Sequence, residues 1–266
     1  MAEHLFAEHL LEHKGVHQRS IYRFFKGLVK FNGTKPVFNS PLLVLAFTNR
    51  CGSNLTADRL RSTGLIRGLN EQLNAGVVEK GSSLKQITDF PTYIQSCVAR
   101  QAHASCVFGV KASFDQLLMI WRWRITEMFS SLIVIHVERR DIVAQSVSFS
   151  IASQTKRWTS KQIGVAQEPV FLQGDISRRL DSIARQNKGI ELFCNVTGVR
   201  TRKVFYEDIV TKPKEEVEKI AETLGLDLTG WTPSSPSIEK QGTSVNGEFV
   251  SMYRKEMLDR LRAPDP

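Results

Sequence analysis

Cysteine is scarce in this 266-residue chain, and its four cysteines follow no regular spacing. They are Cys51, Cys97, Cys106 and Cys194, and no two of them form a CxxC pair. A disulfide framework would show paired, regularly spaced cysteines. We therefore interpret all four as reduced thiols of a cytosolic protein.

Long apolar runs are also missing. None approaches the roughly 20 residues that span a bilayer. The longest, Pro41–Phe47 and Leu132–Val137, have the length of buried strands. The first residues include acidic side chains and no positively charged segment, so we expect no signal peptide and a cytoplasmic location.

Acidic residues are too few to balance the basic ones. The chain has 27 Asp and Glu against 36 Lys and Arg, which gives a net charge of +9. This balance favours an anionic partner: nucleic acid, a membrane surface or a phosphorylated small molecule. The hydrophobic fraction of 41% excludes wholesale disorder. The length suits one large α/β domain or two small ones.

Residues 1–40 differ from the rest of the chain. A short repeat, AEHLF-AEHLL, precedes a basic and aromatic stretch over Arg19–Phe31. Apolar residues recur at helical spacing, which predicts an N-terminal helical arm. His9, His13 and His17 lie four residues apart and form either a metal-binding face or a solvated polar face; we favour the polar face. The basic half leaves contact with a membrane surface open.

From residue 41 onward, short apolar runs alternate with segments of helical periodicity. The expected strands are Pro41–Phe47, Val107–Val110, Leu132–Val137 and Val204–Tyr206. The expected helices are Leu55–Thr63, Phe114–Phe129, Ile142–Trp158, Glu215–Leu224 and Phe249–Leu261. Such alternation predicts one α/β domain over residues 41–266, with a central parallel sheet flanked by helices. Ligands of such sheets bind beyond the carboxyl ends of the strands.

The turn after the first strand reads TNRCGSN and has the character of an anion site. A strand–turn–helix unit directs backbone N–H groups and a helix N-terminus at one point. Arg50 can clamp a phosphate, and Ser53 and Asn54 can donate hydrogen bonds to it. No lysine follows Gly52, so the GxxxxGK[ST] motif is absent and a metal-dependent nucleotide hydrolase is disfavoured. An ordinary connecting loop is the alternative interpretation.

Several motifs, each at the end of an expected strand, together resemble one known family. FTNRCGSNL resembles the 5′-phosphosulfate loop of sulfotransferases, and RRDIVAQSVSF with QTKRW resembles their 3′-phosphate segment. VFGVK, FYED and the IEKQG stretch match further segments in the same order. The combination is similar to the bacterial carbohydrate sulfotransferases. The resemblance implies a P-loop nucleotide-kinase-like fold and 3′-phosphoadenosine 5′-phosphosulfate as the donor, with no metal.

Residue by residue, the resemblance implies two anion sites. The positions that it assigns to donor binding are Arg50, Cys51, Gly52, Ser53, Asn54, Arg139, Ser148 and Lys240. Arg139 and Ser148 would hold the 3′-phosphate, with Arg140 as the competing arginine. Lys240 would add a third cation, or is a surface lysine of a loop.

For catalysis the resemblance implies Glu71 as the general base and Lys111 as the cation that stabilises the leaving oxygen. The alternative for Glu71 is an exposed loop residue. Larger sulfotransferase families use a histidine two residues after this lysine, a position that Ser113 occupies here. Of the other histidines, His136 lies in an apolar run and is interpreted as a core residue.

Two further local hypotheses follow from the residues themselves. Cys51 lies beside Arg50 near a helix N-terminus, so we expect a lowered thiol pKa and possible redox control. Trp121–Arg124 alternates Trp and Arg, which resembles a surface for stacking nucleic-acid bases. Its helical spacing favours a buried face or a subunit contact instead.

The sequence therefore favours sulfuryl transfer to a hydroxyl of a carbohydrate or glycolipid, with two alternatives. One is a non-catalytic protein that binds adenosine bisphosphate. The other is a basic nucleic-acid-binding module, whose affinity would fall steeply with salt. A homodimer is expected by analogy with the family only.

Overall fold

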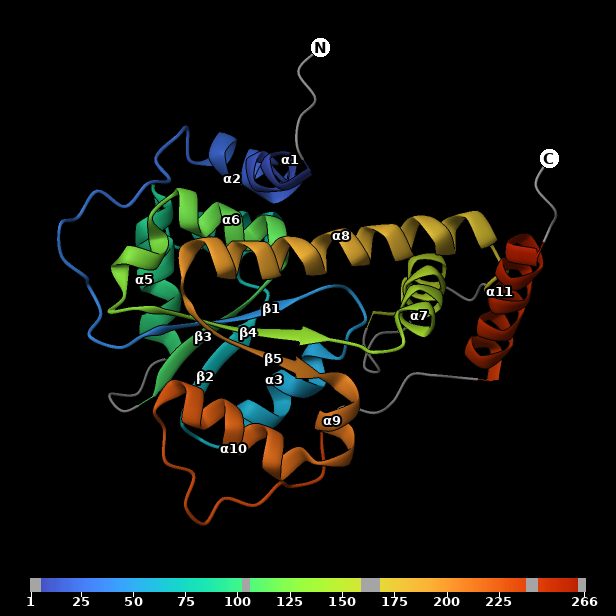
Figure 1. The fold of residues 1–266 in the computed structure, drawn as a ribbon. Coiled ribbons are helices and arrows are strands. Elements are labelled where there is room, and N and C mark those ends of the chain that lie inside the picture. Colours follow the sequence, from blue (N-terminus) through green and yellow to red (C-terminus); the bar gives the residue numbers. More distant parts are fainter. Residues whose placement is uncertain (1–5, 102–105, 159–167, 238–243, 263–266) are drawn as a thin grey trace.

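We describe the protein from a computed structural model, in which residues 6–101, 106–158, 168–237 and 244–262 are placed (Figure 1). The strands are β1 (Leu42–Phe47), β2 (Ile66–Asn70), β3 (Val107–Ala112), β4 (Leu132–Glu138) and β5 (Arg200–Phe205). The helices are α1 (Phe6–Glu12), α2 (Val16–Phe24), α3 (Ser53–Ser62), α4 (Ala75–Leu84), α5 (Phe90–Gln101), α6 (Phe114–Arg122), α7 (Ile142–Thr155), α8 (Gln173–Thr197), α9 (Tyr206–Thr211), α10 (Pro213–Leu224) and α11 (Ser244–Arg262), with a 3-10 turn η1 (Ile125–Met128).

The strands that the structure describes form one five-stranded, all-parallel sheet in the order β2-β3-β1-β4-β5. All six residues of β1 are buried, which explains the unbroken apolar run in this part of the sequence. β5 lies at an edge, and four of its six residues are charged or polar. The predicted central parallel sheet flanked by helices is confirmed.

Two apolar layers sandwich the sheet. Leu42, Val44 and Ala46 of β1 pack against residues of α2, α5, α6 and α8. Leu43 and Leu45, on the opposite face, pack against α3, α9 and α10. α7 and α11 lie beyond the carboxyl ends of the strands and pack on the first half of α8 (Figure 1). These helices therefore form a wall beside the carboxyl ends of the strands, where a ligand is expected.

Some predicted elements differ from those in the structure. β2, α4, α5 and the 25-residue α8 were not predicted. Tyr206 was expected in a strand but begins α9, and the helix expected over Phe114–Phe129 ends at Arg122 because Arg124 adopts a left-handed conformation with φ 57°. The helix expected to reach Trp158 ends at Thr155, followed by Lys156 at φ 55°.

The N-terminal arm packs on the first apolar layer. Ile21, Phe25 and Val29 lie in the same cluster as β1, and α1 and α2 cover α6 and α8 (Figure 1). Arg122 of α6 donates hydrogen bonds to the carbonyl oxygens of Leu11 and His13. Of the Trp and Arg stretch, Trp123 is buried and Arg122 holds the arm, but the side chains of Trp121 and Arg124 are 40% and 42% exposed, so the expected buried face is present only in part.

Within the described part of the chain, no helix is both long and apolar enough to cross a membrane.

Candidate functional site

The site lies at the carboxyl ends of β1 and β4, where the segments that leave the two strands run to opposite sides of the sheet. The chain leaving β1 runs to β2 on one side, whereas the chain leaving β4 runs to β5 on the other, so the carboxyl ends of β1 and β4 form the switch point at which ligands of such sheets bind. Gln145 of α7 joins the two connections at this switch point: its Nε2 donates to Thr48 Oγ1 at 2.9 Å and to the carbonyl oxygen of Asn49 at 2.8 Å. The two loops that carry the predicted anion sites are therefore held side by side.

The loop after β1 presents backbone donors. Arg50 and Gly52 both have positive φ, at 67° and 92°, and Gly52 is the N-cap of α3. In the described structure no N-cap side chain bonds the start of α3, and the N–H of Ser53 faces the thiol of Cys51, so the next N–H groups of the first turn are available to an anion. Ser53 is buried at this helix start, and Asn54 is half-buried. The predicted 5′-phosphosulfate residues thus share one loop and helix start.

Arg50 links this loop to the segment after β4. Its Nε donates to Ser148 Oγ at 3.0 Å, and its Nη1 donates to the carbonyl oxygen of Trp158 at 2.7 Å. Burial lowers the pKa of Arg50, and the positive charge of Arg139 lowers it further. Two guanidinium groups and a hydroxyl therefore lie together at the switch point, and their positive charge suits an anion.

Arg139 is the second arginine at the carboxyl ends of β1 and β4. It is partly buried, and its Nε has no hydrogen-bond partner among the residues that the structure describes. Its guanidinium lies 5.3 Å from the ring centroid of Tyr206. A buried guanidinium donor without a partner is costly, so an anionic ligand would stabilise it.

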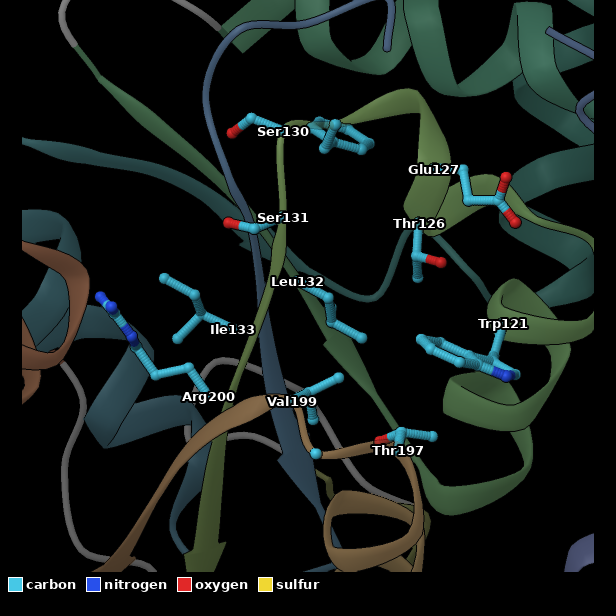
Figure 2. A pocket seen from close by; sticks show the side chains of 12 residues that line it. Trp121, Thr126, Glu127, Ser130, Ser131, Leu132, Ile133, Thr197, Val199 and Arg200 are labelled. Carbon is cyan, nitrogen blue, oxygen red and sulfur yellow. The ribbon is translucent and has the colours of Figure 1, made fainter. Parts of the chain in front are cut away.

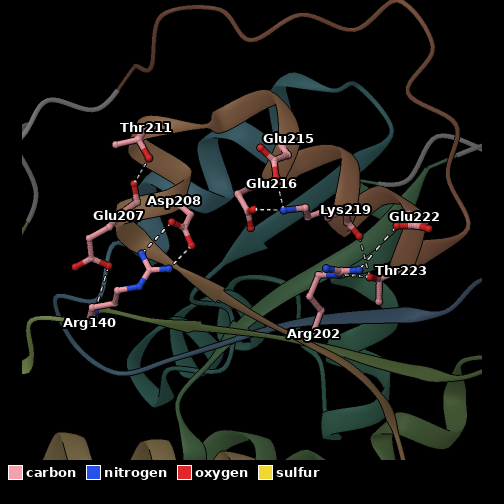
Figure 3. Close-up of polar contacts among 10 residues, drawn as sticks. All are labelled: Arg140, Arg202, Glu207, Asp208, Thr211, Glu215, Glu216, Lys219, Glu222 and Thr223. Atoms are coloured by element: carbon pink, nitrogen blue, oxygen red, sulfur yellow. Dashed lines mark hydrogen bonds and ion pairs between the residues drawn. The ribbon is translucent and has the colours of Figure 1, made fainter.

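Arg140, by contrast, is held by the protein. Its two terminal nitrogens donate to the two carboxylate oxygens of Asp208 at 2.9 and 2.6 Å, and its backbone N–H donates to Glu207 (Figure 3). Its guanidinium also lies over the ring of Phe205. Of the two competing arginines, the geometry leaves Arg139 available to a ligand.

A second polar cluster lies on the other side of β1. Lys111, near the end of β3, is only 3% exposed, and its Nζ donates to Glu71 Oε1 at 3.0 Å and to Asn54 Oδ1 at 2.5 Å. The same Nζ lies 4.7 Å from the ring centroid of Phe47. Asn54 belongs to α3, so this cluster directly adjoins the anion loop. The two predicted catalytic residues are thus in direct contact.

Glu71 is 45% exposed, which leaves its carboxylate accessible to an acceptor. Burial alone would raise its pKa, but the charge of Lys111 and hydrogen bonds from Lys111 and Asn74 outweigh it and hold the pKa below the ordinary value. Glu71 is therefore an anion at neutral pH. An ionised, exposed carboxylate next to a buried cation is suited to accept a proton while the cation stabilises developing negative charge.

The expectation for Cys51 was wrong. The side chain is fully buried, and burial raises the pKa of its thiol to about 11. Hydrogen bonds from the backbone of Ser53 and Thr48 and the charge of Lys111 lower it only in part. A buried neutral thiol is inert, so Cys51 is a packing residue of the loop. Lys240 lies outside the described residues.

Sequence reasoning missed several polar residues of the site, among them Gln145, Tyr206, Asn74 and Gln116. Gln145 and Gln116 are buried, at 0% and 3% exposure. Two amides among the apolar residues of predicted helices were the available signal, because buried amides need partners. Asn74, just before α4, and Tyr206, the first residue of α9, carried no such signal.

A hollow of about 510 Å³ lies elsewhere, at the amino ends of β4 and β5 (Figure 2). Trp121, Leu132, Val199 and Arg200 line it. It lies at the amino ends of the strands, whereas Arg139 follows the carboxyl end of β4, so the hollow is separate from the site described above.

Comparisons with known proteins place these observations in context. The family model of the Stf0 sulphotransferases matches residues 107–256, which include Lys111, Arg139 and Ser148. Trehalose 2-sulfotransferase from Mycolicibacterium smegmatis is 27% identical over 128 residues, which cover 48% of this chain and 47% of that protein. The alignment thus spans about half the length of this relative.

Among solved structures, the chain is similar to a sulfotransferase from Alicyclobacillus acidocaldarius, with 13% identity and a TM-score of 0.48 over 85% of this chain and 97% of the other. It is also similar to a mouse sulfotransferase complexed with PAP, with 11% identity and a TM-score of 0.43 over 86% of this chain and 70% of the other.

Proposed function

Since the chain belongs to the Stf0 sulphotransferase family, we propose that it transfers a sulfuryl group from 3′-phosphoadenosine 5′-phosphosulfate to a hydroxyl of a carbohydrate or glycolipid. The observation that carries this proposal is the meeting of two arginine-bearing segments at the carboxyl ends of β1 and β4. There, the loop with Arg50 meets the segment with Arg139, whose buried Nε lacks a partner in the described structure. A donor with separate 5′ and 3′ anionic groups suits two such adjoining sites.

Each part of the donor has its set of residues in this proposal. The loop residues Arg50, Gly52, Ser53 and Asn54 hold the 5′-phosphosulfate, aided by the N–H groups that follow Ser53 in the first turn of α3. Arg139 and Ser148 hold the 3′-phosphate. Cys51 contributes as a buried packing residue of this loop.

The polar cluster of Lys111, Glu71 and Asn54 carries out the chemistry. Glu71 accepts the proton of the acceptor hydroxyl as the acceptor oxygen bonds to sulfur. At the same time the bond between sulfur and the 5′-phosphate oxygen breaks, and adenosine 3′,5′-bisphosphate leaves. Lys111 has three N–H donors, of which Asn54 and Glu71 accept two, so one remains for the oxygen that gains charge. This assignment needs no metal.

The donor site is tested by calorimetric titration with adenosine 3′,5′-bisphosphate, with adenosine 5′-phosphate and Mg-ATP as controls. Tight binding that requires the 3′-phosphate is the expected result. Equal affinity for adenosine 5′-phosphate would contradict the assignment of Arg139 and Ser148. A steep loss of affinity with salt, shared by unrelated polyanions, would favour the nucleic-acid alternative.

Transfer itself is tested with radiolabelled donor and a panel of mono-, di- and glycolipid saccharides. Trehalose is the first acceptor to try, because the mycolicibacterial relative is named for it. Glu71→Gln keeps the size of the side chain but removes the base, and we expect a rate loss of roughly a hundredfold to ten-thousandfold with bisphosphate binding retained. Donor binding without transfer to any acceptor would favour a non-catalytic protein.

A further inference from the structure

Asn74 occupies the position of a helix cap without acting as one. It is the N-cap of α4, with the extended backbone (φ −71°, ψ 131°) that caps adopt, yet its side chain makes no capping hydrogen bond. Its Nδ2 donates instead to Glu71 Oε2 at 2.9 Å, and its Oδ1 accepts from Gln116 Nε2 at 2.7 Å. A capping hydrogen bond is thus given up for contacts with the site.

The N-terminal arm supplies an acceptor at the start of α4. Nδ1 of His17, on α2, accepts a hydrogen bond from the backbone N–H of Ala75 at 3.1 Å. This bond requires Nδ1 to be unprotonated, and burial lowers the pKa of His17, which favours that form. A free N–H at the start of α4 is thus satisfied from outside the helix. The start of α4 retains a partner while the side chain of Asn74 turns toward Glu71.

The orientation of both amides follows from a backbone group. The N–H of Ser113 donates to Gln116 Oε1 at 2.9 Å, as part of the capping box of α6. Because a backbone N–H is only a donor, the oxygen of the Gln116 amide must face it. The Nε2 of Gln116 then faces Asn74, whose oxygen accepts. The remaining Nδ2 of Asn74 must therefore face Glu71 as a donor.

From this series of hydrogen bonds we propose that Asn74 and Gln116 are positioning residues, which hold the carboxylate of Glu71 in place for the acceptor hydroxyl. The proposal rests on the role of Glu71 in the proposed function. Asn74 binds Oε2, Lys111 binds Oε1, and each oxygen keeps a lone pair with which to accept a proton. Gln116 acts only through Asn74, because its own contacts are with Asn74 and Ser113.

The titratable groups facing the Glu71 carboxylate are Lys111 on β3 and His17 on α2, while Asp115 on α6 faces His17. The substitutions chosen for the test are neutral, so these charges stay the same. Any change in the titration midpoint of Glu71 then reports whether the amide of Asn74 still donates its hydrogen bond to the carboxylate.

The test measures the Glu71 titration by NMR on protein with labelled glutamate carboxyls, in which Glu71→Gln identifies the resonance. We expect Asn74→Ala to raise the titration midpoint by about one pH unit, because a donor to a charged group is lost. Gln116→Met, of similar size, should raise it by less. In the Asn74→Ala background, Gln116→Met should cause no further change.

Gln186→Met is the matched control, because the Gln186 amide binds Ser182 on its own helix α8. It should leave the midpoint unchanged. Asn74→Ser serves as a second variant should Asn74→Ala fail to fold. An unchanged midpoint in the Asn74 variants, or additive effects in the double variant, would overturn the proposal.

The two proposals fail in different ways. Transfer kinetics of Gln116→Met should show a lower kcat with an unchanged KM for the donor. If Glu71→Gln transfers sulfate as fast as the parent, the base assignment fails, and with it the catalytic purpose of the amide chain. If Glu71→Gln is inactive but the titration midpoint of Glu71 is unchanged in the Asn74 and Gln116 variants, only the positioning proposal fails.

Discussion

Lys111 lies 3.0 Å from Glu71, with its Nζ donating to Oε1, although forty residues separate the two in the chain. The contact joins β3 to the segment after β2, because these strands are neighbours in the sheet and both end at this edge. The pair brings a cation and a base to one point beside the anion loop.

The first prediction concerns the pH dependence of this pair. The pKa of Glu71 is lowered in the folded protein, so the carboxylate stays ionised until the pH falls through that lowered value. Its ionisation stabilises the fold above the pKa of the unfolded chain, and this contribution is lost as the pH falls through the folded pKa. Urea unfolding from neutral to acidic pH should therefore show a stability advantage of the parent over Glu71→Gln that shrinks toward low pH.

Lys111→Met supplies the complementary variant. Without the cation, burial should raise the folded pKa of Glu71 toward or above that of the unfolded chain, so the loss of stability on acidification that Glu71 contributes should shrink or disappear. An identical pH dependence in the parent and in Lys111→Met would contradict the role of this ion pair.

The second prediction separates two neighbouring arginines. Arg139→Gln should weaken binding of adenosine 3′,5′-bisphosphate by about tenfold to a hundredfold, the value of a hydrogen bond to a charged group. Arg140→Gln should leave the affinity unchanged, because Arg140 is bound to Asp208 (Figure 3). Calorimetric titration of both variants measures this difference. The reverse ranking would assign the 3′-phosphate to Arg140.

Parts of the fold were predictable because their signals are local. β1 and β4 are continuous apolar runs, and the motifs at their ends led to the family that the match over residues 107–256 confirms. β2 was missed because IRGLN is short and contains a bulge, with Gly68 and Leu69 both at positive φ. α8 was missed because much of its length is solvent-facing and its apolar residues are widely spaced.

The site was predictable only as separate residues. Glu71 and Lys111 came from the family resemblance, but their contact depends on β2, which was not predicted. The meeting of Asn74 with Gln116 depends on how two helix starts pack. The pKa of Cys51 was misjudged because the neighbouring cation and helix were visible in the sequence, whereas the complete burial of the side chain was not.

The third prediction concerns Gly52. Its φ of 92° is strained for any residue with a Cβ, and a Cβ at this position would lie 2.3 Å from Cδ2 of Tyr206. Gly52→Ala should therefore destabilise the protein by about 2 kcal/mol or more, from backbone strain and overpacking together. Displacement of Tyr206 would also disturb Arg139, so bisphosphate affinity should fall. Gly64→Ala is the control, because a Cβ there meets nothing within 4 Å although φ is also positive.

Chemical denaturation of both variants distinguishes the two contributions. The strain is common to Gly52→Ala and Gly64→Ala, so the additional loss at Gly52 measures the clash with Tyr206. Equal losses of stability and unchanged bisphosphate affinity would show that Tyr206 moves aside freely and does not support Arg139.

The fourth prediction concerns thiol reactivity. A pKa of about 11 leaves roughly one Cys51 in ten thousand as thiolate at neutral pH, and complete burial limits access further. Cys106 is partly exposed, whereas Cys97 and Cys194 are buried. Alkylation of the native protein should therefore modify Cys106 first, and the denatured chain should react at all four cysteines.

Peptide mapping by mass spectrometry after a short exposure to iodoacetamide measures the order of reaction. In Cys106→Ser, the fast reaction should disappear while Cys51 stays unmodified. Transfer activity of the parent should survive this treatment, since the thiol of Cys51 takes no part in the proposed chemistry. Rapid modification of Cys51 in the native protein would require the loop after β1 to open, and would restore a redox role as a hypothesis.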